Sequence, residues 1–148
     1  MSRLLDTTVI IDYANGRPEA RDIVEQLFAG AEDLLICDAV VAEALSGGTD
    51  QESAVIDALI RSLEYVSTSP DAARWAGESR RAVTRPGRRH LGDALIGGVA
   101  MVLGATVVTR NPEDFVRMGI PVVTYGAEAP ADIGPSGRSS VVKRPSTP

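Results

Sequence analysis

Four acidic residues lie in stretches of this sequence that are otherwise apolar. Asp6 directly follows two leucines, Glu43 lies within the run VVAEAL, Asp93 opens a long apolar stretch, and Asp114 comes shortly after the run TVVT. A carboxylate in such company is costly unless something compensates its charge. Mg²⁺ or Mn²⁺ would do so, because hard cations take carboxylate oxygens and keep waters for a phosphate substrate. The four acids therefore predict a divalent-metal site that acts on a phosphate.

Each of the four acids also has a simpler interpretation. Asp6 and Asp93 stand where they could cap the helices that follow them. Glu43 could pair with an arginine, and Asp114 could be a first-turn acid that the helix dipole favours. Spacing alone leaves these alternatives open.

The order of strands and helices would bring these acids toward one edge of a sheet. Short apolar runs predict strands at residues 4–5, 33–37, 65–66, 105–109 and 121–123. Apolar residues at helical spacing predict helices at residues 7–13, 19–29, 39–45, 51–63, 70–84, 91–103 and 111–118. Such alternation is typical of an α/β domain with three layers, in which a mainly parallel twisted sheet is flanked by helices. Functional groups in such sheets collect at the carboxyl ends of the strands.

Length and composition indicate one globular domain followed by a tail. The chain has 148 residues, of which 44% are hydrophobic and 24% charged, so one core can form without staples. We expect this domain at residues 1–126. Residues 127–148 turn to Gly, Ala, Pro and Ser without periodicity, and we expect them to be disordered or ordered only by a partner.

The apolar segments and the single cysteine point to the cytoplasm. Cys37 lies in the run LLIC, where we expect a buried small hydrophobe in a reducing compartment. No signal peptide is expected, because Asp6 and Asp12 interrupt the first apolar stretch. The longest apolar run, residues 94–109, contains three glycines and is too short to span a bilayer comfortably. We therefore expect no membrane association.

Four segments, taken in order, resemble the motifs of PIN domains, in the branch of VapC-type toxins of toxin–antitoxin pairs. They are residues 4–12 (LLDTTVIID), 41–45 (VAEAL), 93–100 (DALIGGVA) and 104–115 (GATVVTRNPEDF). Each segment is a weak match alone, but the four in this order and at these spacings make a strong one. The resemblance covers about residues 3–125 and implies the PIN fold, with a parallel sheet flanked by helices.

The resemblance also implies a set of metal ligands. Asp6 and Asp93 would be the principal ligands of Mg²⁺, and Glu43 would bind it directly or through water. Some relatives carry the fourth acid where Asn111 stands here, and others where Asp114 stands. This chain has the second pattern, so Asp114 is assigned to the site and Asn111 becomes a polar helper.

Two threonines would support these ligands, since Thr8 and Thr109 fall where they could hydrogen-bond the carboxylates. The implied reaction is endonucleolytic hydrolysis of RNA, in which a water made more acidic by the cation attacks the phosphorus in line. Catalysis by a serine or histidine is disfavoured, because no serine has an obvious base and His90 is the only histidine.

Charge is unevenly distributed along the chain. A net charge of −5 argues against nucleic-acid binding, although four acids gathered in one metal site would contribute much of it. Residues 80–90 hold five arginines. We expect Arg85, Arg88 and Arg89 to guide RNA phosphates toward the metal. The alternative is a solvated helix face and loop, or a docking surface for an acidic partner segment.

The resemblance finally implies partners. It predicts a toxin that is inhibited by a cognate VapB-type antitoxin, that forms a two-fold homodimer, and that contacts DNA only through the antitoxin. Two rival functions remain open. One is a non-catalytic PIN-like module that acts through protein or DNA partners, and the other is a metal-dependent phosphohydrolase of small molecules.

Overall fold

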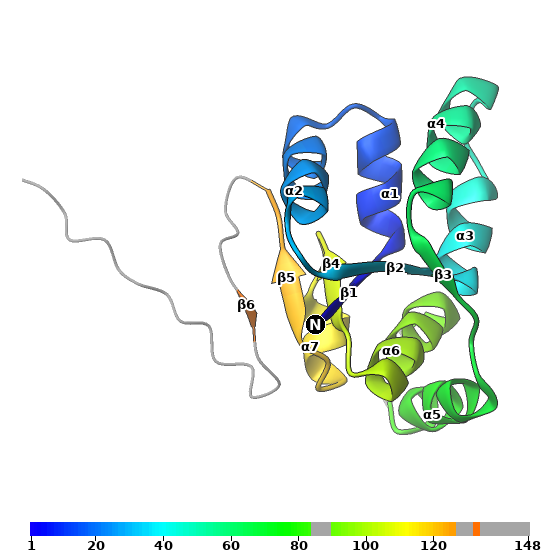
Figure 1. The fold of residues 1–148 in the computed structure, drawn as a ribbon. Coiled ribbons are helices and arrows are strands. Elements are labelled where there is room, and N and C mark those ends of the chain that lie inside the picture. Colours follow the sequence, from blue (N-terminus) through cyan, green and yellow to red (C-terminus); the bar gives the residue numbers. More distant parts are fainter. Residues whose placement is uncertain (84–89, 127–131, 134–148) are drawn as a thin grey trace, which may run out of the picture.

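The computed structural model describes residues 1–83, 90–126 and 132–133. One sheet lies between two groups of helices (Figure 1), so the predicted α/β class is confirmed. The strands are β1 (Ser2–Leu5), β2 (Asp33–Cys37), β3 (Glu64–Val66), β4 (Thr106–Thr109), β5 (Val122–Thr124) and β6 (Asp132–Ile133). The helices are α1 (Thr7–Ala14), α2 (Pro18–Ala29), α3 (Asp38–Leu45), α4 (Asp50–Arg61), α5 (Pro70–Arg81), α6 (Leu91–Leu103) and α7 (Glu113–Arg117).

The sheet is parallel except at one edge. Its strand order is β3-β2-β1-β4-β5-β6, and only β6 runs antiparallel to its neighbour among the described strands. In the centre, Leu4 of β1 lies opposite Leu35 of β2 and Val107 of β4. Leu4 and Val107 are fully buried, as expected for a central strand that is covered on both faces.

The connections between strands diverge at the middle of the sheet. From β1 the chain moves to β2 and then to β3, whereas from β4 it moves the opposite way, to β5. With right-handed crossovers, α1 to α4 lie over one face and α5 to α7 over the other (Figure 1). Because the connections of β1 and β4 part in this way, a crevice forms outside the carboxyl ends of these two strands.

The core is aliphatic, in keeping with the low aromatic content. Leu5, Val108 and Ile96 are fully buried, and Phe115 is the largest of the fully buried side chains. Cys37 is also fully buried, which confirms its prediction as a small hydrophobe. Burial raises the pKa of its thiol to about 11, so the sulfur stays protonated at neutral pH and is not a nucleophile.

The predicted elements recur, with shifts at their ends. Thr49 and Ser69 each accept a main-chain N–H from the residue three positions on, and these caps begin α4 and α5. The helix predicted to reach residue 84 ends at Arg81, and the last predicted strand lies one residue later, at Val122–Thr124.

Strand β6 lies within the segment 127–148, for which the sequence predicted disorder or order that depends on a partner. It is two residues long and pairs with Val122 and Val123 of β5. The other residues of that segment lie outside the described ranges, so its dependence on a partner stays a prediction. Across the described ranges, none of the helices has the length and apolar character needed to cross a membrane.

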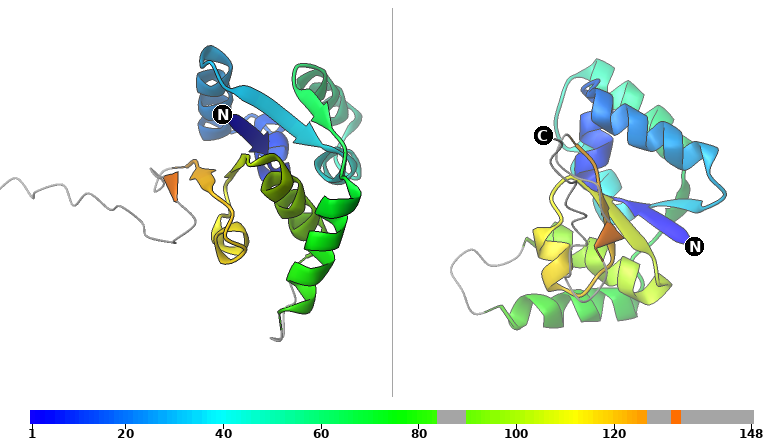
Figure 2. Two further views of the ribbon diagram at one scale, coloured as in Figure 1. Left: turned by 60° about the horizontal axis from the view of Figure 1, so that its bottom comes forward. Right: turned by 90° about the vertical axis from the view of Figure 1, so that its left-hand side faces the viewer.

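Two glycines determine how α6 packs and where it ends. Gly104 adopts the left-handed conformation with φ 65° and ends the helix. A Cβ at Gly98 would overlap the carbonyl oxygen of Ala72 in α5. The two helices, which lie side by side in Figure 2, therefore approach each other at a point where only glycine fits.

Replacing Gly98 with alanine should lower the free energy of unfolding by roughly 1–3 kcal/mol, the usual cost of overpacking. Gly77→Ala in α5 is the matched control, since a Cβ there meets no atom within 4 Å. Alanine at position 77 should stabilise the protein by up to about 1 kcal/mol through its helix propensity. Urea denaturation measures both changes, and equal stability of the two variants would contradict the close approach of α5 and α6.

Candidate active site

Asp6 is held at the carboxyl end of β1 by two threonines. It occupies the N-cap position of α1, but its side chain makes no capping hydrogen bond. Its Oδ2 instead accepts hydrogen bonds from Thr109 Oγ1 at 2.8 Å and from Thr8 Oγ1 at 3.1 Å. The capping interpretation of its carboxylate is therefore wrong, because the carboxylate is turned toward β4.

The surroundings of Asp6 disfavour its negative charge. Asp6 is only 3% exposed, and burial raises its pKa, while the hydrogen bonds from Thr109 and Thr8 oppose that shift. Thr109 is fully buried and also accepts the main-chain N–H of Asn111 at 3.1 Å. This network fixes the position of the Asp6 carboxylate.

Glu43 reaches the site from α3 and rests against α6. The Glu43 side chain is exposed, and α3 buries Val40 and Ala44. Its carboxyl group lies so close to Gly92 that a Cβ at Gly92 would overlap it. The glycine before Asp93 thus makes room for Glu43.

Three groups influence the charge of Glu43. Partial burial and the nearby Asp6 carboxylate raise its pKa, while His90 and Thr7 oppose the shift. The Thr7 hydroxyl is buried and lies near Glu43 without completing a hydrogen bond within the described part of the chain. Glu43 also forms no ion pair with an arginine among residues 1–83 and 90–126, which removes that alternative there.

Asp93 is the acid on which the charges of the other three act. It stands in the first turn of α6, whose N-cap is His90, so Asp93 is not the cap. Burial and the negative charges of Asp6, Asp114 and Glu43 together raise its pKa to about 6, although His90 opposes the shift. We call Asp6, Glu43, Asp93 and Asp114 the acid cluster.

Asp114 joins the acid cluster from α7. It lies in the first turn of α7, which also suits the helix dipole, and it forms an ion pair with Arg117 at 3.6 Å. Its side chain is 36% exposed, yet its charge acts on Asp93. Asn111 contacts the Thr109 hydroxyl through its main-chain N–H and carbonyl oxygen.

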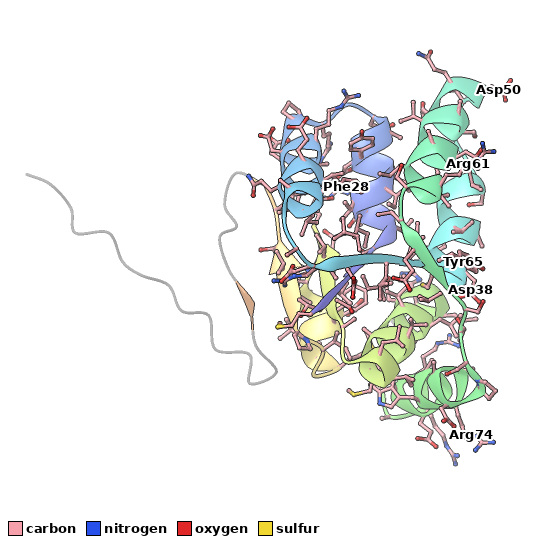
Figure 3. The ribbon with its side chains drawn as sticks, in the orientation of Figure 1. Phe28, Asp38, Asp50, Arg61, Tyr65 and Arg74 are labelled. Atoms are coloured by element: carbon pink, nitrogen blue, oxygen red, sulfur yellow. The ribbon has the colours of Figure 1, made fainter. Side chains whose placement is uncertain are left out.

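Asp38 provides a useful contrast to the acid cluster. It directly follows β2 and is the first residue of α3 (labelled in Figure 3). Its carboxylate accepts hydrogen bonds from the hydroxyl and main-chain N–H of Thr68 and from Ala39 N–H. Burial alone would raise the pKa of Asp38, but these hydrogen bonds outweigh it and lower the pKa. Asp38 therefore has a structural role, in which hydrogen bonds stabilise its charged form. The pKa of Asp93 in the acid cluster is raised instead.

The acid cluster gathers negative charge without forming a finished metal site. Within residues 1–83, 90–126 and 132–133, no three His, Cys, Asp or Glu side chains are placed so that they could hold a metal ion together. The donor chemistry nevertheless fits a hard cation, since all four members offer carboxylate oxygens. The unpartnered Thr7 hydroxyl also suits a polar guest.

A hollow of about 610 Å³ opens beside the acid cluster. Glu43, Asp93 and His90 form its polar side, and Ala42, Leu91 and Leu95 are among its apolar residues. This volume falls in the range of pockets that bind small ligands. The site can therefore receive part of a substrate next to its carboxylates.

Sequence reasoning missed several residues around this site. Gly92 and Thr7 gave no signal of their contact with Glu43. Asp12 did give one, because a charge inside the run VIID requires a partner. The partners of Asp12 include Arg110 and Tyr125, and no pattern in the sequence connects these residues to it. Arg85, Arg88 and Arg89, which it predicted to contact RNA, lie outside the described residues.

Fold and site together define a class of protein. The members of this class are three-layer α/β domains in which the connections of a parallel sheet diverge. The acid cluster lies at the carboxyl ends of β1 and β4. The family model described as "PIN domain" matches residues 3–121. The chain therefore belongs to the PIN domain family, as its sequence motifs predicted.

Individual relatives agree with this assignment. Ribonuclease VapC19 of Mycobacterium tuberculosis is 29% identical over 115 residues, which cover 76% of this chain and 91% of that protein. The structure of DNA-bound VapBC from Salmonella typhimurium matches with 26% identity and a TM-score of 0.69, over 84% of this chain and 98% of that chain. VapBC2 from Rickettsia felis, bound to a promoter DNA fragment, shares the fold with a TM-score of 0.71 at 24% identity, over 85% of this chain and 100% of that chain.

The raised pKa of Asp93 predicts how stability changes with pH. Its folded-state pKa of about 6 lies above the ordinary value of 3.8, so the folded state binds this proton more tightly than the unfolded state. The free energy of unfolding therefore falls as the pH rises between these two values. In EDTA, thermal unfolding should give a higher Tm at about pH 5 than at about pH 8.

Asp93→Asn should raise the Tm at the higher pH and flatten the pH dependence, because the half-buried negative charge is gone. Asp22→Asn, which removes an exposed carboxylate from α2, is the matched control and should do neither. A wild-type Tm that is equal at both pH values, or a lower Tm for Asp93→Asn at the higher pH, would contradict the electrostatic account of the acid cluster.

Proposed function

We propose that this chain is a metal-dependent endoribonuclease that acts as the toxin of a toxin–antitoxin pair. The observation that carries the proposal is the acid cluster at the divergence of β1 and β4 in a member of the PIN domain family. The name of the VapC19 relative, a ribonuclease, supports the reaction class. Burial and three neighbouring carboxylates raise the pKa of Asp93, whereas hydrogen bonds lower the pKa of Asp38.

Asp6 and Asp93 are the proposed principal ligands of Mg²⁺ or Mn²⁺. Glu43 would bind directly or through water, and Asp114 would be the fourth ligand. When bound, the cation would supply a more acidic attacking water and charge neutralisation on the phosphate. It would also relieve the repulsion that raises the pKa of Asp93.

Residues of the chain itself would position the groups that react. Thr109 and Thr8 hold the Asp6 carboxylate toward the site, so that it need not reorganise during the reaction. Asn111 would support this arrangement, because its main-chain N–H donates a hydrogen bond to Thr109. The hollow beside Asp93 would receive a nucleotide that flanks the cleaved bond.

The partner of the toxin would be a VapB-type antitoxin. The structures from Salmonella typhimurium and Rickettsia felis contain VapBC bound to DNA, which supports a cognate antitoxin for this chain and DNA contact through that antitoxin. A homodimer, a cytoplasmic location and an RNA-guiding role for Arg85, Arg88 and Arg89 belong to the same proposal. Residues 127–148 would depend on the partner for their order.

Cleavage of total RNA by the partner-free protein tests the proposal. Discrete cleavage should require Mg²⁺ or Mn²⁺ and stop in EDTA. Asp6→Asn and Asp93→Asn should each slow it by roughly a hundredfold or more, as when one group that stabilises developing charge is removed. Asp22→Asn is the control for losing a carboxylate elsewhere and should cleave like the wild type.

Other outcomes would identify the rival functions. Hydrolysis of a small phosphodiester, with RNA neither cut nor competing, would indicate a small-molecule phosphohydrolase. Absence of cleavage, with no Mg²⁺ or Mn²⁺ binding by calorimetry, would overturn the enzyme and favour a module that works only through its partners.

A further inference from the structure

Asp12 is a buried carboxylate that the proposed function leaves unused. It is 3% exposed and lies in α1 four residues after Thr8, hence on the same side of the helix. Its Oδ2 accepts a hydrogen bond from the Tyr125 hydroxyl at 2.8 Å. Its Oδ1 lies 3.2 Å from Nη1 of Arg110 and 3.9 Å from Nε of Arg17.

Arg110 connects this buried acid to the acid cluster. It directly follows β4, and its main-chain N–H donates to Thr8 Oγ1 at 3.1 Å. The same Thr8 hydroxyl donates to Asp6. The backbone of Arg110 is thus anchored beside Asp6, while its guanidinium is directed to Asp12.

The pairing with Asp12 holds the Arg110 guanidinium at Asp12 rather than at the acid cluster. Within the described residues, the only ion pair of Arg110 is with Asp12. Tyr125 completes this arrangement as a hydrogen-bond donor. Burial raises the pKa of its phenol, with the hydrogen bond to Asp12 as the next cause, so the hydroxyl stays protonated at neutral pH.

The guanidinium of Arg110 has donors to spare. Arginine carries five N–H groups in a planar fork that suits carboxylate and phosphate alike, and Asp12 occupies only part of them. The side chain is 38% exposed and borders a cleft of about 380 Å³ that is also lined by Asp12, Arg17, Glu19, Tyr125 and Gly126. Arg17 lies on the same cleft with its side chain 54% exposed.

An RNA strand that approaches four carboxylates needs a fixed positive charge nearby. The net charge of −5 provides no general attraction. We propose that Arg110 binds a phosphate of the RNA strand next to the cleaved one, with Asp12 and Tyr125 as positioning residues that hold its guanidinium in the cleft. This inference rests on the proposed ribonuclease function and adds a substrate contact to it.

Kinetics of RNA cleavage and RNA affinity together test this contact. Arg110→Ala should raise the KM and weaken binding of a fluorescein-labelled mixed-sequence RNA by roughly tenfold to a hundredfold, the range of a charged hydrogen bond. The dependence of log affinity on log salt should become shallower by about 1. The kcat should change little, because Arg110 contacts a phosphate that is not cleaved.

Matched variants separate charge from positioning. Arg110→Lys keeps the charge but not the fork, so it should retain the salt dependence while losing part of the affinity. Tyr125→Phe should raise the KM less than Arg110→Ala and leave the salt dependence unchanged. Arg61→Ala removes an exposed arginine of α4 that pairs only with Asp57 among the described residues (Figure 3) and should behave like the wild type.

The outcomes distinguish this inference from the function on which it rests. Binding is also measured in the Asp93→Asn background, so that an RNA which binds without being cut still reports on Arg110. If the wild type neither binds nor cleaves RNA, both proposals fail. If it binds RNA, and Arg110→Ala matches Arg61→Ala in KM, affinity and salt dependence, the Arg110 contact alone is overturned. A lower Tm with unchanged KM would likewise reduce Arg110 to a structural role.

Discussion

Repulsion among four carboxylates is the constraint around which this domain is arranged. Burial, followed by the charges of Asp6, Asp114 and Glu43, raises the pKa of Asp93 to about 6. At neutral pH the folded chain therefore carries negative charge where the protein itself provides little compensation. An acid with a structural task looks different, since hydrogen bonds hold the pKa of Asp38 low. The imbalance at the acid cluster is most simply explained by a cationic guest, which the proposed function identifies as Mg²⁺ or Mn²⁺.

The fold explains why the charges meet at this place. β1 and β4 are neighbours whose connections leave in opposite directions, so the crevice at their carboxyl ends is open to a ligand. Thr109 ends β4 and Thr8 lies shortly after β1, and both donate hydrogen bonds to Oδ2 of Asp6. Gly92 lets Glu43 approach from α3. The same edge carries Arg110, whose backbone touches the acid cluster and whose side chain is held away from it.

The sequence predicted the layers of the fold and the acid cluster because both depend on local patterns. Apolar runs and helical periodicity predicted the strands and helices to within a few residues. A charged residue within an apolar run can also be recognised from the sequence alone. Contacts between distant segments leave no such pattern. The approach of Glu43 to Gly92, and the pairing of Asp12 with Tyr125 across 113 positions, arise only when α1, α3, α6 and β5 come together.

The account depends most directly on whether the acid cluster binds a divalent cation. Crystals of the partner-free protein soaked in Mn²⁺, with data collected at the manganese absorption edge, would locate the ion by its anomalous scattering. The account predicts a peak between Asp6 and Asp93 in the wild type and its loss in Asp93→Asn. A wild-type crystal with no peak at the acid cluster, at a Mn²⁺ concentration that supports RNA cleavage in solution, would contradict it.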